Sequence, residues 1–224
     1  MLENRLLQSL SPRLRDALES DLEHIELHKD DVLLEASSPI EFVYFPTTSL
    51  ISMIASLENG NAVEAATIGN DGFAGVTALL GMDRANITAV VQVPGEAYRM
   101  RFGAFRGHIA DSEFRDKLGE FAGRLFTTIA QSTACIAFHP VQERLARWLL
   151  LVRDGTQSDE FLLTQDFIAV MLGVHRPTVT VTVRLLESAG LIQHRRGRIR
   201  IIDPDALAEA ACECYRLSLS PGER

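Results

Sequence analysis

Hydrophobic residues recur along the chain with two different periods. In the first segment, residues 2–27, they fall three or four positions apart, which predicts helix. Ser11-Pro12 interrupts the pattern and predicts the start of a second helix, because proline suits the first helical turn. His24 and His28 share the helical spacing and are expected on the solvated face. The segment therefore predicts two consecutive helices.

Between residues 31 and 100 the period changes to short β-branched and aromatic runs separated by turn signals. The strands are expected at residues 32–34, 42–45, 50–55, 62–68, 89–93 and 97–100. Asn59-Gly60 predicts a hairpin with a type I′ turn, which needs positive φ at both residues. Many short strands at this spacing predict an antiparallel sandwich or barrel.

A long helix is expected over residues 111–137, with one apolar face formed by Phe114, Leu118, Phe121, Leu125 and Ile129. A stripe of this length favours a dimer interface, although packing on the protein's own barrel remains the alternative. Pro140 ends the helix and can open the next one, at 141–152. The segment 138–140 is therefore the expected boundary between two domains.

Residues 162–202 contain the most specific signal, a predicted helix-turn-helix followed by a basic hairpin. Thr164 suits the N-cap of a first helix, and Gly173 suits the tight turn that follows it. Pro177 then falls in the first turn of a second helix, which Gly190 ends. Its buried face is expected to consist of Val179, Val183 and Leu186.

The opposite face of the second helix has few acids and suits a DNA major groove. It carries Arg176, Thr178, Thr180, Val181 and Arg184, with Arg176 placed to fork onto a guanine edge. Two strands at 191–193 and 199–202 would form a wing whose Arg196 and Arg198 contact phosphates. Each part alone is common in ordinary domains, whereas all of them within about forty residues predict DNA binding.

Charge is distributed unevenly along the 224 residues, whose formal net charge is −8. Residues 1–111 hold 8 basic residues against 16 acidic ones, whereas residues 160–202 hold 6 arginines against 3 acids. A local basic excess is what phosphate binding requires. No apolar run is long enough to span a membrane, and the first ten residues lack an apolar signal core. We therefore expect a cytoplasmic protein without a membrane partner.

The cysteines do not predict a disulfide framework or a metal site. Cys135, Cys212 and Cys214 are odd in number, and Cys212-x-Cys214 is one residue short of the usual ligand spacing. A cupin-like metalloenzyme is the enzymatic alternative for a barrel, but residues 31–100 contain no histidine or cysteine. The sequence thus predicts neither a catalytic site nor a bound metal.

The order of these features resembles the Crp/Fnr family of regulators, the family of the cyclic-AMP receptor protein. The stretch 173–180, GVHRPTVT, is similar to the start of that family's recognition helix. The resemblance implies an α+β protein with an N-terminal antiparallel β-roll of the cyclic-nucleotide-binding type (1–110), a dimerisation helix (111–137) and a winged helix-turn-helix (138–224). It also implies that Arg176 reads guanine, that Thr164 and the adjacent Gln165 lie at the phosphate backbone, and that RNA polymerase is a partner.

The chain departs from the family where relatives hold cyclic AMP. The positions that match their glycine–glutamate and arginine–serine pairs read Gly75-Val76 and Ile87-Thr88, and Arg84 lies only in the nearby loop. A buried phosphate without a cation lacks a charge-assisted partner, so cyclic AMP is not expected as the ligand. Three cysteines also fall short of the four that hold an iron–sulfur cluster, and haem ligation by one of the six histidines stays open.

The sequence therefore predicts a homodimeric, sequence-specific DNA-binding regulator that acts on a near-palindromic operator, with an unidentified effector at the β-roll. The alternative from another class is a cyclic-nucleotide-binding sensory module with a role that does not involve DNA.

Overall fold

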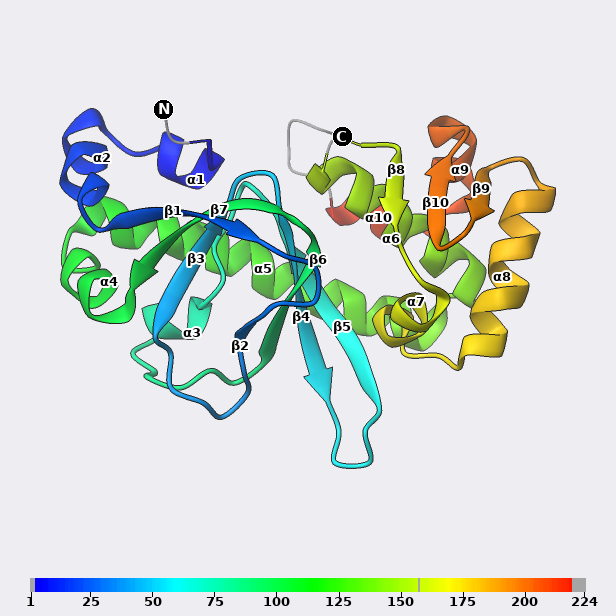
Figure 1. Ribbon diagram of the computed structural model, residues 1–224, viewed down its shortest axis with the longest axis horizontal. Helices are drawn as coiled ribbons and strands as arrows, with labels where there is room; N and C mark the ends of the chain where they lie inside the picture. The colour runs from blue at the N-terminus through cyan, green and yellow to red at the C-terminus, as the bar shows by residue number, and fades with distance from the viewer. Residues whose placement is uncertain (1–2, 157, 219–224) are drawn as a thin grey trace. The chain divides into compact units, whose positions relative to one another are not determined.

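The computed structural model describes residues 3–156 and 158–218, and the chain divides into two compact units (Figure 1). Unit 1 comprises Met1–Ala55 and Ala66–Phe126, and unit 2 comprises Ser56–Ala65 and Thr127–Arg224. No helix in the described ranges is long and apolar enough to cross a membrane.

The N-terminal segment is helical only in its first part. Helices α1 (Arg5–Gln8) and α2 (Pro12–Glu19) confirm the break at Ser11-Pro12, and Leu2 lies outside the described residues. The predicted helix is wrong beyond this point, because Leu22–Leu27 forms strand β1, which pairs with strand β7. His24 lies on that strand and His28 directly follows it. Both histidines are exposed, as expected, but neither lies on a helix.

Two antiparallel sheets form the body of unit 1, in agreement with the predicted antiparallel sandwich or barrel. One sheet has the strand order β1-β7-β3 and the other β2-β6-β4-β5 (Figure 1). The strands are β2 (Val32–Leu34), β3 (Phe42–Pro46), β4 (Leu50–Ser56), β5 (Ala62–Ile68), β6 (Thr88–Val93) and β7 (Gly95–Arg101). Their inward side chains, among them Phe45, Ile51 and Met100, are fully buried and form an apolar core.

The hairpin between β4 and β5 has a different turn from the predicted one. Gly60 has φ +84°, whereas Asn59 is not among the residues with positive φ. The Gly60 amide donates to the Leu57 carbonyl at 3.0 Å, and the Leu57 amide donates to the Asn61 carbonyl at 2.8 Å. This is a three-residue loop with a left-handed glycine, so the predicted hairpin is confirmed and its type I′ turn is wrong.

The helices of unit 1 complete its core. Short helices α3 (Val76–Leu79) and α4 (Phe102–His108) were not expected, and the long helix α5 spans Ser112–Phe138. The ring of Phe121 on α5 packs 5.5 Å from that of Phe73, measured between centroids. A Cβ atom at Gly72 would lie only 2.1 Å from the Phe121 ring, so this position requires glycine.

Unit 2 contains several helices and a small three-stranded sheet. Its helices are α6 (Val141–Thr156), α7 (Gln165–Leu172), α8 (Arg176–Ser188), α9 (Pro204–Ala210) and α10 (Cys214–Ser218). The sheet has the order β8-β10-β9, with strands β8 (Glu160–Leu162), β9 (Ile192–Arg195) and β10 (Arg198–Ile201). The break at Pro140 is confirmed, α6 is longer than expected, and β8 adds a strand to the predicted pair.

The tip of the β4–β5 hairpin belongs to unit 2. The indole Nε1 of Trp148, on α6, donates a 2.8 Å hydrogen bond to the buried Glu64 carboxylate. Burying a carboxylate without a hydrogen-bond donor costs free energy. The hydrogen bond from Trp148 therefore favours the position in which the tip of the hairpin contacts α6.

Candidate nucleic-acid interface and effector pocket

The helix-turn-helix is built by local signals that agree with the sequence. The Thr164 hydroxyl caps α7 by accepting the Phe167 amide at 3.2 Å. Gly173 has φ +61° and ends the helix, and the Val174 amide closes the turn onto the Ala169 carbonyl at 3.0 Å. A residue with a side chain would be strained in this left-handed conformation, so glycine fixes the turn before α8.

Helix α8 has one buried and one exposed face, as predicted. Val179, Val183 and Leu186 are at most 1% exposed. Of the predicted contact residues, Arg176, Thr178, Val181 and Arg184 are exposed and Thr180 is partly buried. Between residues 176 and 186 the helix carries no acidic side chain, so this face can approach phosphates without repulsion.

Two of the predicted DNA contacts also join α7 to α8. The Thr180 hydroxyl donates to the Gln165 side-chain oxygen at 2.7 Å, and both residues are partly buried. The bond fixes where the two helices cross, and it leaves the amide nitrogen of Gln165 outside this contact. Arg176 lies 3.4 Å from Asp166, but both side chains are more than 60% exposed. Such an exposed pair contributes little and is easily exchanged for a phosphate.

The wing contains the type I′ turn that was expected elsewhere. Arg196 has φ +50° and Gly197 has φ +75°, and the flanking Arg195 and Arg198 pair directly across the turn. Two consecutive left-handed residues match the right-handed twist of the strands. The exposed side chains of Arg196 and Arg198 therefore lie at the tip of a rigid hairpin.

Glu160 on β8 holds two wing arginines. Its carboxylate lies 2.5 Å from the Arg200 guanidinium and 3.4 Å from that of Arg198. The hydrogen bond from Arg200 lowers the pKa of Glu160 below its usual range. The sequence reading did not assign Arg200 to the site. The sequence feature that could have identified Arg200 is the alternation of arginine and isoleucine over 198–201, which places both arginines on the solvated side of one strand.

The expected effector residues form only a small pocket in unit 1. Gly75, Val76 and Ile87 line a cavity of about 20 Å³, whereas Thr88 is not among its lining residues. Such a volume holds about one water molecule, far less than a nucleotide. Arg84 is not part of the lining either, and its guanidinium donates to the Ser37 carbonyl at 2.6 Å.

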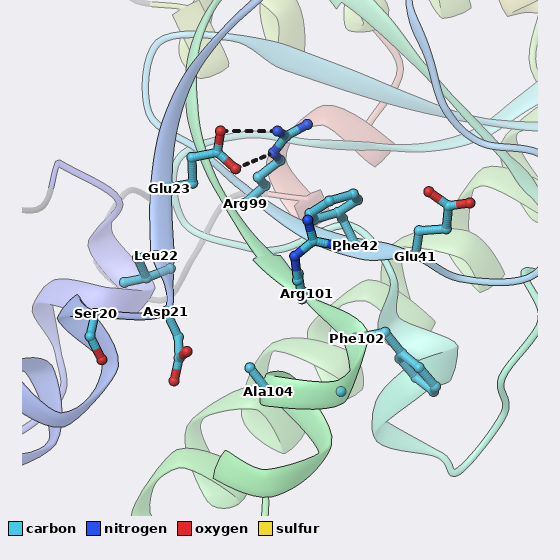
Figure 2. Close-up of a pocket in the computed structure, with 11 residues that line it drawn as sticks. Ser20, Asp21, Leu22, Glu23, Glu41, Phe42, Arg99, Arg101, Phe102 and Ala104 are labelled. Atoms are coloured by element: carbon cyan, nitrogen blue, oxygen red, sulfur yellow. Dashed lines mark hydrogen bonds and ion pairs between the residues drawn. The ribbon is translucent and has the colours of Figure 1, made fainter.

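A second hollow in unit 1 was not predicted. It is an open cleft of about 600 Å³ beside β1, β3 and β7, shown in Figure 2. Arg99 forms a two-pronged hydrogen bond with Glu23, at 2.8 and 3.0 Å, and its guanidinium lies 4.4 Å from the centre of the Phe42 ring. Arg101 lies 5.1 Å from the same ring. The cleft thus combines an aromatic surface with two cations, one of them already paired with a carboxylate.

The expected dimer residues on α5 point into their own protomer. Phe114, Leu118, Phe121 and Leu125 are at most 6% exposed and pack in the core of unit 1, and only Ile129 is partly exposed. These four buried side chains do not form a surface that a partner can contact. The alternative that the sequence left open, packing on the protein's own sandwich, describes them.

The outward face of α5 has a different composition. Among its exposed residues, one row follows alternating steps of four and three and consists of Gly119, Gly123, Phe126, Ala130, Thr133 and Ala137. Phe126 is 74% exposed, and a Cβ atom at Gly119 or Gly123 would meet no atom within 4 Å. Small residues at this spacing allow a second helix to approach closely. The sequence reading missed this face because it followed large apolar residues alone.

Two family models match the chain. Residues 24–112 match the cyclic nucleotide-binding domain, and residues 143–210 match the Crp-like helix-turn-helix domain. No curated protein matches the chain in sequence.

Solved structures with the same fold cover nearly the whole chain. A protein from Eubacterium rectale assigned to the Crp/Fnr family has a TM-score of 0.73 at 16% identity and covers 92% of this chain and 96% of its own. A Crp/Fnr-family regulator from Thermus thermophilus has a TM-score of 0.71 at 23% identity, with 84% and 98% covered. The c-di-GMP-responsive regulator CLP from Xanthomonas campestris has a TM-score of 0.70 at 13% identity, with 86% and 100% covered.

The cyclic nucleotide-binding domain precedes the Crp-like helix-turn-helix domain, as the sequence resemblance implied, and the fold is shared with these regulators. The chain therefore belongs to the Crp/Fnr family of transcription regulators.

Proposed function

We propose that this protein is a sequence-specific DNA-binding regulator that acts as a homodimer on a near-palindromic operator. The observation that carries the proposal is the exposed, acid-free face of α8 with Arg176 at its N-terminal end. A helix with one buried face and one basic, solvated face can enter a major groove without losing its own packing. The alternative role without DNA does not account for this face.

The two basic elements have different tasks in this proposal. Arg176 reaches base edges, because the N-terminal residues of a recognition helix lie deepest in the groove. Arg196 and Arg198 on the wing contact phosphates, and Arg200 adds to them when DNA displaces Glu160. Thr164 and Gln165 lie at the start of α7, where a backbone phosphate would be held, while Thr180 keeps the two helices in register.

The homodimer forms through the outward face of α5. Two copies related by a two-fold axis would bring the small residues of this face together and bury Phe126 on both sides. Two recognition helices on such an axis imply half-sites about 34 Å apart. RNA polymerase is the further partner that the family relation supports.

The effector acts through unit 1, and cyclic AMP is not that effector. The cavity at Gly75 and Val76 is too small for a nucleotide and no basic side chain lines it. A signal bound in unit 1 would bias the separation of the two DNA-binding heads of the dimer, which couples the two sites. The response to c-di-GMP is a property of the Xanthomonas protein.

The proposal is tested by selecting duplexes from a random pool with the purified full-length chain. We expect enrichment of one two-fold symmetric sequence, with affinity that falls steeply as salt increases. Failure to enrich any sequence, at a salt concentration where scrambled duplexes are not bound, would argue for the alternative module without a DNA target.

A further inference from the structure

Four side chains with metal-binding atoms meet inside unit 2. Cys135 lies near the end of α5, and His139 directly follows that helix. Cys212 lies between α9 and α10, and Cys214 is the first residue of α10. Their ligand atoms all lie within 4.8 Å of one another. The Cys135 and Cys212 sulfurs are 3.5 Å apart, and the Cys214 sulfur is 3.5 Å from Nδ1 of His139.

These distances suit a tetrahedral ion. Zinc binds thiolate sulfur at about 2.3 Å, so two sulfurs at tetrahedral corners stand about 3.8 Å apart. A closed set of three cysteines and one histidine is one of the usual structural zinc sites. The three cysteines are at most 4% exposed, so an ion at this place would be shielded from water.

The histidine is held in the orientation that a ligand needs. Its Nε2 lies 3.1 Å from the Glu213 carboxylate, while Nδ1 faces the Cys214 sulfur. A proton on Nε2 that is donated to Glu213 leaves the Nδ1 lone pair directed at the cluster. Metal-binding histidines commonly donate their other nitrogen to a carboxylate in this way, which fixes the ring and increases its basicity.

Polar and charged side chains also lie close to the sulfurs. The Gln131 side-chain nitrogen donates to the Cys214 sulfur at 3.0 Å. Burial raises the pKa of the Cys135 thiol and raises that of Cys212 to about 12, so both cysteines must lose a proton when a metal ion binds. Arg144 and Arg147 on α6 are buried, and the charge of Arg147 acts on Cys135 in the opposite direction to burial. Three thiolates with one zinc ion leave a single net negative charge, so a nearby buried cation compensates for it.

We propose that Cys135, His139, Cys212 and Cys214 bind one zinc ion. The site would tie the C-terminal end of α5 and the residue before Pro140 to the segment that follows α9. It is a structural site, because all four positions of the ion are filled by protein ligands. The spacing of Cys212 and Cys214 did not predict this site, because the other two ligands lie at the end of a helix more than 70 residues earlier in the chain.

The test uses the full-length chain, reduced and stripped of metal by a chelator, and titrated with Co²⁺. We expect one equivalent to bind, with a sulfur-to-metal charge-transfer band and the visible bands of a tetrahedral site, and Zn²⁺ to displace it. Zn²⁺ in excess should also raise the unfolding temperature, because an ion that binds only the folded state stabilises that state. A reduced chain that gives neither the bands nor the shift would overturn the proposal.

Variants identify the ligands. Cys212→Ser and His139→Ala should lose the tetrahedral spectrum, and Glu213→Gln should keep it while weakening metal affinity about 10- to 100-fold. His28→Ala is the matched control, since that histidine is exposed and outside the cluster. An unchanged spectrum in His139→Ala would refute the four-ligand set. A different result would identify Cys135 and Cys212 as a redox pair instead. In that case the protein isolated without reductant would contain a Cys135–Cys212 disulfide and no zinc, and it would not bind Co²⁺ after reduction.

Discussion

Replacing Phe126 with alanine tests the proposed dimer face directly. The side chain is 74% exposed in the protomer, so its removal leaves the core of unit 1 intact. Burying a whole phenylalanine side chain is worth about 1.5–3 kcal/mol, and three quarters of that is about 1–2 kcal/mol per protomer. A symmetric dimer buries two copies, so Phe126→Ala should weaken dimerisation by about 2–4 kcal/mol, or about 30- to 700-fold.

Sedimentation equilibrium over a range of protein concentrations measures this change. Leu80→Ala is the matched control, because Leu80 is 71% exposed but does not lie on α5. It should leave the dimer constant unchanged, and both variants should keep the helix content of the unmodified chain by circular dichroism. A dimer of unchanged affinity in Phe126→Ala would refute the outward face of α5 as the interface. Substituting the buried Leu118 and Leu125 with glutamate would not decide the question, because it would disrupt the fold first.

Three further predictions concern other parts of the molecule. Glu160→Gln should release Arg198 and Arg200 and tighten binding to a scrambled duplex, with a steeper salt dependence in a fluorescence titration. Hydrogen bonds from the Ser11 amide and hydroxyl lower the pKa of Glu113. The ionised carboxylate therefore stabilises the fold at pH values above the unfolded pKa of about 4.3. This stabilisation is lost as the pH falls below that value. Acid unfolding curves should therefore show a smaller loss of stability in Glu113→Gln below that pH. Calorimetry with millimolar cyclic AMP should show no heat of binding, and micromolar affinity would contradict the pocket assignment.

Local patterns predicted the elements whose causes are local. The strands from Val32 to Arg101 follow short β-branched runs, and the helix-turn-helix follows from a cap at Thr164 and a left-handed turn at Gly173. Each of these signals acts within a few residues, so neither requires knowledge of a distant partner.

Features that depend on distant partners were not predictable in this way. Strand β1 forms because it pairs with β7, where Leu22 faces Met100 across the sheet. Its spacing of apolar residues alone looks helical. Strand β8 likewise exists through its pairing with β10.

The α5 faces were misassigned for a related reason. Large apolar side chains fill the nearest core, and the aromatic cluster around Phe73 takes up Phe121. The exposed residues of α5 include a row of small residues around Phe126, and a pattern based on hydrophobicity alone gives such a row little weight. The cysteine–histidine cluster shows the same limit, because its ligands become neighbours only once unit 2 is folded.

The central claim is that α8 reads DNA sequence. It is tested by measuring how tightly Arg176→Ala binds a selected duplex and its scrambled counterpart across a salt series. Arg115→Ala, which removes the same charge from an exposed position on α5, is the control. The account predicts that Arg176→Ala loses about 1–3 kcal/mol on the selected duplex, with relaxed preference at one base pair, and little on the scrambled one. Equal losses on both duplexes would make Arg176 a phosphate contact and would contradict the assignment of the recognition face.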